Sequence, residues 1–101
     1  MKRRMRVTVK FTQTIRFLTE TDHIIINLDE NVHLSNLLDV LATRYGEHLI
    51  DILYNSESDS IDVWPSIIVD GKAVPLPIKP QTDVELREGS VVVLMKAVSG
   101  G

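Results

Sequence analysis

The sequence predicts a single α+β domain, and three observations support this expectation. The chain has 101 residues, of which 44% are hydrophobic and 25% charged, as in one ordinary globular domain. Apolar and polar residues alternate near the N-terminus, which is typical of a half-buried strand. Residues 34–45 instead repeat apolar side chains at helical spacing. Strands and a helix therefore follow one another within one short chain.

The first two strands are predicted to form an antiparallel hairpin. Residues 5–12 alternate between apolar and polar side chains, and residues 23–28 are rich in β-branched isoleucine. Between them, residues 19–22 have the sequence Thr-Glu-Thr-Asp, which has the composition of a turn. We therefore expect the two strands to pair directly across this turn.

The main helix is predicted over residues 34–45, with His33 or Ser35 near its start. Gly46 follows it, at the place where glycine commonly ends a helix. A weaker turn of helix is expected over residues 47–54, with inward-facing Leu49, Ile50 and Leu53. The polar and acidic segment that comes next is predicted to be a surface loop.

The second half of the chain predicts two further strands and a short return. Residues 66–69 are nearly all apolar, which is typical of a strand inside a sheet. Asp70-Gly71 is a hairpin-turn signal, and the chain returns through residues 72–74. An irregular crossover is expected next, because it contains Pro75, Pro77 and Pro80. A tight turn at residues 86–89 then leads into the last strand, residues 90–96.

The composition excludes several kinds of site. The chain has no cysteine, so disulfides, thiolate metal sites and a cysteine nucleophile are excluded. Its histidines lack ligand spacing, so we expect no metal site at His23, His33 or His48. Glu57, Asp59 and Asp62 lack the pattern of a calcium loop and are interpreted as a solvated loop. Trp64 is interpreted as a half-buried residue without a ligand.

The N-terminal segment is basic and lacks the continuous apolar run of a signal peptide. No stretch is long and apolar enough to cross a membrane, so we expect a cytoplasmic protein. A basic arm can bind nucleic acid, but here it has neither an aromatic platform nor a second basic stretch. We interpret it as a solubilising feature at a strand edge rather than an RNA contact. Its members are Lys2, Arg3, Arg4, Arg6, Lys10 and Arg16.

The sequence closes with Val98-Ser99-Gly100-Gly101, directly after the apolar run 91–95. Because glycine has no Cβ, two glycines allow a main-chain carboxylate to enter a narrow partner site. A frayed end or a linker remnant would also explain them, and this reading stays open here.

Four segments, in order along the chain, carry a family resemblance: Phe11 with Ile15–Leu18, the helix 34–45, the strand and turn 67–72, and the closing segment 86–101. Together they resemble the MoaD/ThiS-like sulfur-carrier family. This family includes the small subunit of molybdopterin synthase and archaeal ubiquitin-like modifier proteins. The sequence departs from the family pattern at two places: Lys96-Ala97 stands where Pro-Pro is common, and Ser90 stands where Asp is usual.

The resemblance implies a β-grasp, ubiquitin-like fold, with a mixed sheet of four to five strands packed on one main helix. It implies a domain over residues 1–96 and a free tail over residues 97–101. The protein would be a substrate and not an enzyme. An adenylating enzyme of the ubiquitin-activating type would use ATP to join the Gly101 carboxylate to AMP.

Sulfur would then give a thiocarboxylate, or a lysine of a target protein would give an isopeptide. Molybdenum or tungsten cofactor synthesis, with the molybdopterin synthase large subunit as partner, tRNA thiolation and protein tagging remain open. No cofactor, metal, membrane or nucleic acid is expected to bind the chain itself.

Alternation divides the last strand into two faces, with Val92 and Leu94 on one of them. The resemblance implies that the other face and the tail contact the partner, through Val91, Val93, Met95, Val98, Ser99 and Gly100. A second reading places all five residues 91–95 in the core. A second functional class also remains: a β-grasp domain that binds protein or RNA and whose Gly-Gly is incidental.

Overall fold

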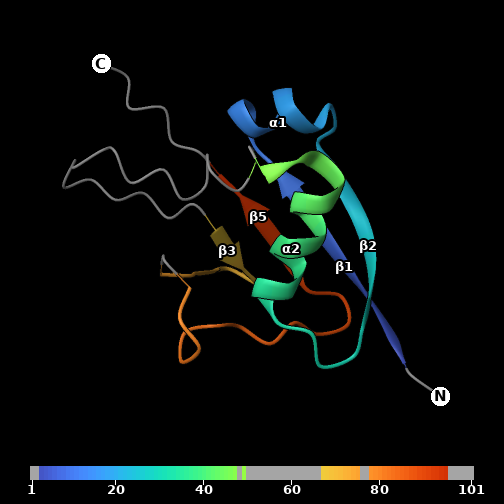
Figure 1. Cartoon of the computed structure of the whole chain (residues 1–101), viewed down its shortest axis with the longest axis vertical. Coiled ribbons are helices and arrows are strands. Elements are labelled where there is room, and N and C mark those ends of the chain that lie inside the picture. The colour runs from blue at the N-terminus through green and yellow to red at the C-terminus, as the bar shows by residue number, and fades with distance from the viewer. Residues whose placement is uncertain (1–2, 48, 50–66, 76–77, 96–101) are drawn as a thin grey trace.

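The computed structural model describes residues 3–47, 49, 67–75 and 78–95. Five strands form one sheet in the order β2-β1-β5-β3-β4, and helix α2 lies across one of its faces (Figure 1). The strands are β1 (Arg4–Phe11), β2 (His23–Asp29), β3 (Ile67–Val69), β4 (Lys72–Ala73) and β5 (Val91–Leu94). The helices are α1 (Gln13–Thr19) and α2 (Leu34–Tyr45). The predicted α+β class and the expected mixed sheet on one main helix are therefore confirmed.

Strand β5 occupies the centre of the sheet. It pairs in parallel with β1, where Thr8 lies opposite Val91, and antiparallel with β3, where Ile68 lies opposite Val93. Strand β5 thus lies between β1, from the start of the chain, and β3, from its second half. This position places the beginning of the C-terminal segment beside the end of β1.

Strands β1 and β2 pair antiparallel over seven residue pairs, from Arg4 opposite Asp29 to Lys10 opposite His23. The expectation that they join through a turn alone is wrong, because α1 stands between them. The seven-residue α1 is too short to show an apolar repeat, and it buries mainly Ile15 and Thr19, one turn apart. Turn-forming residues do follow, and Glu20 ends the helix with a positive φ of 60°.

The core lies between α2 and the sheet. Four leucines of α2 are buried, and they share one cluster with the inward side chains of β1 and β5. Complete burial of one such side chain contributes about 1.5–3 kcal/mol. The α2 members are Leu34, Leu37, Leu38 and Leu41, and the sheet members include Val7, Val9, Val92 and Leu94.

Helix α2 begins at a capping box. The Asn36 side chain accepts a bond from the His33 N–H at 3.0 Å, and the Asn36 N–H donates to the His33 carbonyl, also at 3.0 Å. The Asp83 carboxylate accepts further bonds from the N–H of Ser35 (3.1 Å) and from its hydroxyl (2.5 Å). The start of α2 is therefore fastened to the loop that precedes β5.

The turns of the second half follow the sequence signals. Asp70 and Gly71 both have positive φ, 49° and 85°, as a tight hairpin turn requires. β5 is shorter than the expected strand 90–96. In the weak helical segment Glu47 and Leu49 are helical and Leu49 is buried, whereas residues 50–54 lie outside the described residues.

Candidate functional site

Burial alternates along β5 as the sequence predicts. Val92 and Leu94 have no exposed surface, whereas Val91 and Val93, and Met95 after them, are half-buried. The five side chains therefore do not all belong to the core. The half-buried residues lie on the sheet face opposite α2, which we call the outer face.

The apolar part of the outer face extends over neighbouring strands. Val93 lies opposite Ile68 of β3, which is also half-buried. In the next row Val91 lies opposite Thr8, and Thr8 lies opposite Ile25 of β2, whose side chain is 59% exposed. Apolar side chains on three strands thus form a shallow surface on either side of β1.

Basic side chains cross this surface along β1, where Arg4, Arg6 and Lys10 are exposed on the outer face. Arg6 forms a solvent-exposed ion pair with Glu88, with its Nε 3.5 Å from the carboxylate. The interpretation of the basic arm as a strand-edge feature is wrong for Lys10, which is flanked by β2 and β5. Arg4 and Arg6 pair with β2 but precede the part of β1 that pairs with β5.

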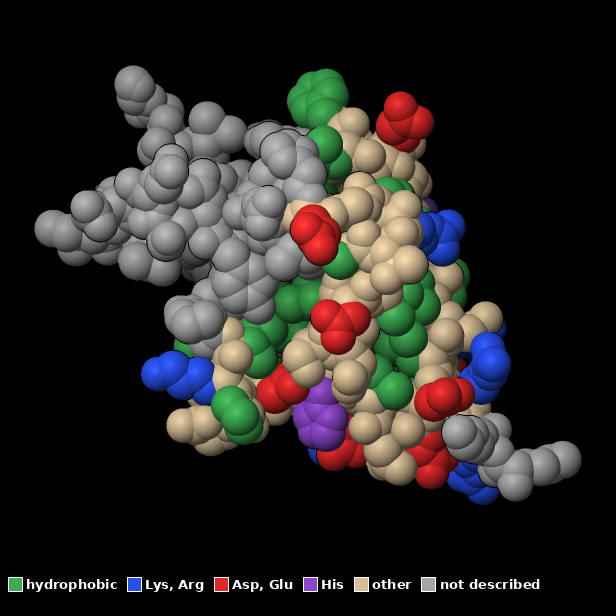
Figure 2. Space-filling view, viewed as in Figure 1, with side chains coloured by type: hydrophobic (Ala, Val, Ile, Leu, Met, Phe, Trp, Pro, Cys, Tyr) green, Lys and Arg blue, Asp and Glu red, His purple; other side chains and the backbone are tan. Residues whose placement is uncertain are grey.

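The opposite face of the molecule has a different charge. Figure 2 shows acidic side chains over and around α2. Exposed or half-exposed carboxylates here include those of Asp39, Asp83 and Glu85. The two faces of the domain therefore present different surfaces to a partner. The outer face is apolar and carries mixed charge, because Asp29 lies opposite Arg4 and Glu88 pairs with Arg6, whereas the other face is largely acidic.

The beginning of β5 is held by the turn between β3 and β4. The Asp70 carboxylate accepts hydrogen bonds from the Val91 N–H at 2.8 Å and from the Ser90 hydroxyl at 3.1 Å. The Ser90 oxygen in turn accepts a bond from the Arg87 N–H at 2.9 Å. Ser90 is buried, and its hydroxyl both donates and accepts, so it suits a position beside a carboxylate.

The end of β5 is held by Thr12. The Leu94 carbonyl accepts a hydrogen bond from the Thr12 N–H at 3.2 Å and another from its hydroxyl at 3.1 Å. Thr12 is also the residue at which α1 begins, yet its side chain makes no capping bond to α1. The hydroxyl therefore secures the last residue of β5 rather than the start of its own helix.

The predicted tail residues Val98, Ser99, Gly100 and Gly101 lie outside the described residues, as does the boundary between residues 96 and 97. His48, Glu57, Asp59, Asp62 and Trp64 also lie outside them. Among the residues that the structure does describe, no three histidine or acidic side chains gather as a metal site would require. In the same part of the chain, no helix is long and apolar enough to span a membrane.

Sequence reasoning identified the faces of β5 and missed what holds its ends. A threonine before a short segment signals a helix N-cap, and Thr12 could have indicated α1 in this way. Its contact with Leu94 joins residues 82 positions apart, and Asp70 reaches Ser90 over 20 positions. No local pattern carries information about such contacts.

No protein-family model matches this sequence, and no curated protein is significantly similar to it. Several solved structures are similar. The putative molybdopterin converting factor subunit 1 from Pyrococcus furiosus has a TM-score of 0.68 and 26% sequence identity, over 93% of this chain and 99% of that chain. The small archaeal modifier protein 1 from Methanosarcina acetivorans has a TM-score of 0.64 and 17% identity, over 98% and 99% of the two chains.

Urm1 from Trypanosoma brucei has a TM-score of 0.66 and 18% identity, over the whole of both chains. These similarities confirm the β-grasp, ubiquitin-like fold. The resemblance seen in the sequence is also confirmed, because the similar structures are small ubiquitin-like carriers and modifiers. Each covers nearly the full described domain, so the likeness is not confined to one motif.

Proposed function

We propose that this chain is a ubiquitin-like sulfur carrier whose C-terminal carboxylate, at Gly101, is activated by a partner enzyme. The observation that carries the proposal is the position of β5: it is the central strand, and hydrogen bonds hold both its ends. A fixed strand followed by seven residues ending in Gly-Gly suits a domain that stays docked while its end reacts elsewhere. The similarity to the molybdopterin converting factor subunit supports the same role.

The proposed reaction takes place on the partner. The Gly101 carboxylate attacks the α-phosphorus of ATP, pyrophosphate leaves, and an acyl-adenylate forms. A hydrosulfide sulfur then displaces AMP to give a thiocarboxylate; alternatively, a lysine amine of a target protein displaces AMP to give an isopeptide. Both routes use a carboxylate that can reach the partner's site, and neither draws on a nucleophile of this chain. We place the protein in the cytoplasm.

The tail sets the reach of this chemistry. The five residues from Ala97 to Gly101 span at most about 16–18 Å when extended. That length allows the carboxylate to enter a deep cleft while the domain remains at its rim. The absence of side chains at Gly100 and Gly101 suits a narrow channel.

The outer face is the proposed docking surface for the adenylating enzyme. Val91, Val93 and Met95 supply apolar area, and Arg4 and Lys10 lie in the neighbouring strand. The complementary partner surface is apolar and carries a carboxylate opposite Lys10, whose neighbours across the sheet are His23 and Val93. Charges of this kind chiefly raise the rate of association, so binding should weaken as salt increases. A molybdopterin synthase large subunit would use the same surface.

Intact-protein mass spectrometry tests the proposal. The chain is incubated with ATP, an adenylating enzyme and a sulfide source, and an oxygen-to-sulfur mass increase at Gly101 is expected. A ladder of lysine-linked adducts would instead identify a modifier.

Gly100→Val should abolish the adenylate while leaving the circular dichroism spectrum unchanged. Ala73→Val, which places the same valine side chain on the exposed strand β4, should react normally. Adenylate formation by the Gly100→Val variant would contradict the tail mechanism.

A second candidate function is a protein- or RNA-interaction domain with an incidental Gly-Gly. The observation that favours it is the outer face itself, which combines apolar area with Arg4, Arg6 and Lys10 and needs no tail to bind a partner. This function predicts no change of mass with any activating enzyme. It also predicts that Lys10→Glu weakens binding as much in a chain lacking residues 97–101 as in the full chain.

A further inference from the structure

We propose that helix α1 forms a second contact with the enzyme that activates the tail, and that Phe17 is its apolar anchor. The inference rests on the function proposed above. Its starting point is the exposure of Phe17, whose side chain is 85% accessible to solvent. Leu18 beside it is 37% exposed. Figure 2 shows hydrophobic side chains protruding at the end of the molecule where α1 lies.

The position of α1 indicates which partner would contact it. Thr12, at the start of α1, holds the Leu94 carbonyl through both its N–H and its hydroxyl. Helix α1 therefore lies directly beside the point where β5 ends and the chain continues towards Gly101 (Figure 1). We infer that a protein that receives the tail approaches this end of the sheet and contacts α1. The occupant we infer is the adenylating enzyme, with an apolar pocket next to its tail channel.

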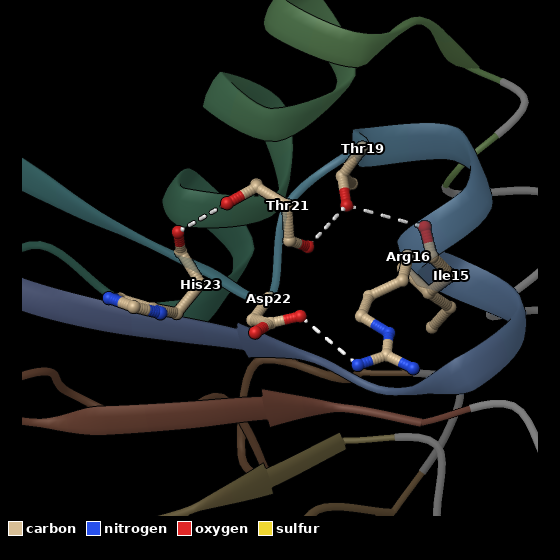
Figure 3. Close-up of polar contacts among 6 residues, drawn as sticks. All are labelled: Ile15, Arg16, Thr19, Thr21, Asp22 and His23. Carbon is tan, nitrogen blue, oxygen red and sulfur yellow. Dashed lines mark hydrogen bonds and ion pairs between the residues drawn. The ribbon is translucent and has the colours of Figure 1, made fainter.

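The structure holds α1 in place on both sides of Phe17. Ile15 and Thr19 point into the core, and the Thr19 hydroxyl lies 3.4 Å from the Ile15 carbonyl and 3.1 Å from that of Thr21 (Figure 3). The Arg16 guanidinium pairs with Asp22 at 3.1 Å and so joins the helix to the turn before β2. An anchor on a fixed element loses little conformational entropy on binding.

The charges around Phe17 indicate what kind of pocket the enzyme would need. Arg16 and Asp22 pair with each other, and the exposed Glu20 at the end of α1 adds a negative charge, so the surroundings lack the cations of β1. Aromatic side chains in apolar pockets commonly dominate the energy of an interface. The contribution of Phe17 should therefore persist at salt concentrations that weaken the contact through Arg4 and Lys10.

A second copy of this chain is a poorer occupant. A stable interface buries about 800 Å² on each partner, whereas one aromatic side chain supplies about 150–250 Å². Phe17 and Leu18 alone fall well short of that area. They suffice as an addition to a surface that the outer face and the tail already provide.

Adenylation kinetics test this inference, with an enzyme chosen because it activates the wild-type chain. Phe17→Ala should raise the concentration of the chain at half-maximal rate by about tenfold or more, as expected for an interface anchor. The rate at saturation should stay unchanged. The increase should be similar at about 0.1 M and about 0.5 M salt. Phe17→Leu should restore most of the affinity.

Val40→Ala is the matched control, since Val40 is a 39% exposed apolar residue on α2. It should leave the kinetics unchanged. Equal kinetics for Phe17→Ala and the wild type would overturn the inference while the proposed function stands. So would a wild-type chain that sediments as a dimer which Phe17→Ala dissociates. If no enzyme activates the wild-type chain, the proposed function fails and the inference fails with it.

Discussion

The hydroxyl of Ser90 donates a hydrogen bond to a carboxylate oxygen of Asp70, 3.1 Å away. Asp70 lies in the turn between β3 and β4, and Ser90 directly precedes β5. The contact therefore fastens an edge hairpin to the first residue before the central strand.

The pairing of these two residues predicts that Ser90→Asp destabilises the fold. A second carboxylate would be buried against Asp70 without a proton to share, and we expect the free energy of unfolding to fall by about 2–3 kcal/mol. Urea denaturation measures this change. The double variant Asp70→Asn, Ser90→Asp should recover much of the loss, because the asparagine amide can donate to the new carboxylate. If the double variant recovers no stability, the loss comes from the size of the new side chain rather than from its charge.

The bond between Asp83 and the start of α2 predicts a cost for its removal. Asp83→Ala removes the acceptor for the N–H and hydroxyl of Ser35, and we expect a loss of about 1–2 kcal/mol in the free energy of unfolding. Asp39→Ala provides the control, because Asp39 is exposed on α2 itself and its replacement should change the free energy of unfolding by less than about 0.5 kcal/mol. Equal losses for the two variants would contradict the capping role of Asp83.

The turn at Asp70-Gly71 predicts a specific sensitivity at Gly71. Gly71 has a φ of 85°, and a Cβ built there meets no atom within 4 Å. Gly71→Ala should therefore cost about 1–2 kcal/mol through backbone strain alone. Asparagine tolerates positive φ better, so Gly71→Asn should be less destabilising when both melting curves are compared. A greater loss for asparagine would argue against strain as the cause.

The packing of α2 predicts a large effect at Leu37. This side chain has no exposed surface, and Leu37→Ala should lower the free energy of unfolding by about 2–5 kcal/mol. Val40→Ala on the outer side of the same helix should stay within about 0.5–1 kcal/mol of the wild type in the same urea titration. A small effect at Leu37 would mean that the core closes around the cavity.

Much of this fold could be predicted from local patterns. The alternation in β1 and β5 shows which side chains face α2, and the leucine spacing delimits α2 itself. The turn at Asp70-Gly71 was readable because few residues adopt positive φ. Such features depend on residues within one or two turns of each other.

The remaining features depend on contacts between distant segments. The place of β1 in the sheet is set by its pairing with β5, so the basic residues of β1 could not be assigned to an interior strand from their composition. Helix α1 buries two side chains, Ile15 and Thr19, which is too little for a periodic signal. The exposure of Phe17 follows from α1 and was therefore equally hidden. At the candidate site, the two faces of β5 were predictable and its fastening points were not.

The pairing of β1 with β5 also bears on when the protein becomes competent. Thr8 and Val91 are neighbours in the sheet although they lie 83 positions apart in the chain. During synthesis the central place in the sheet stays vacant until β5 has been made, and such distant pairings are slow to form. A chain that fails to close its sheet lacks the outer face, because Val91 and Val93 take their places only when β5 pairs with β1. Under the proposed function, folding would therefore have to be complete before a partner could act on Gly101.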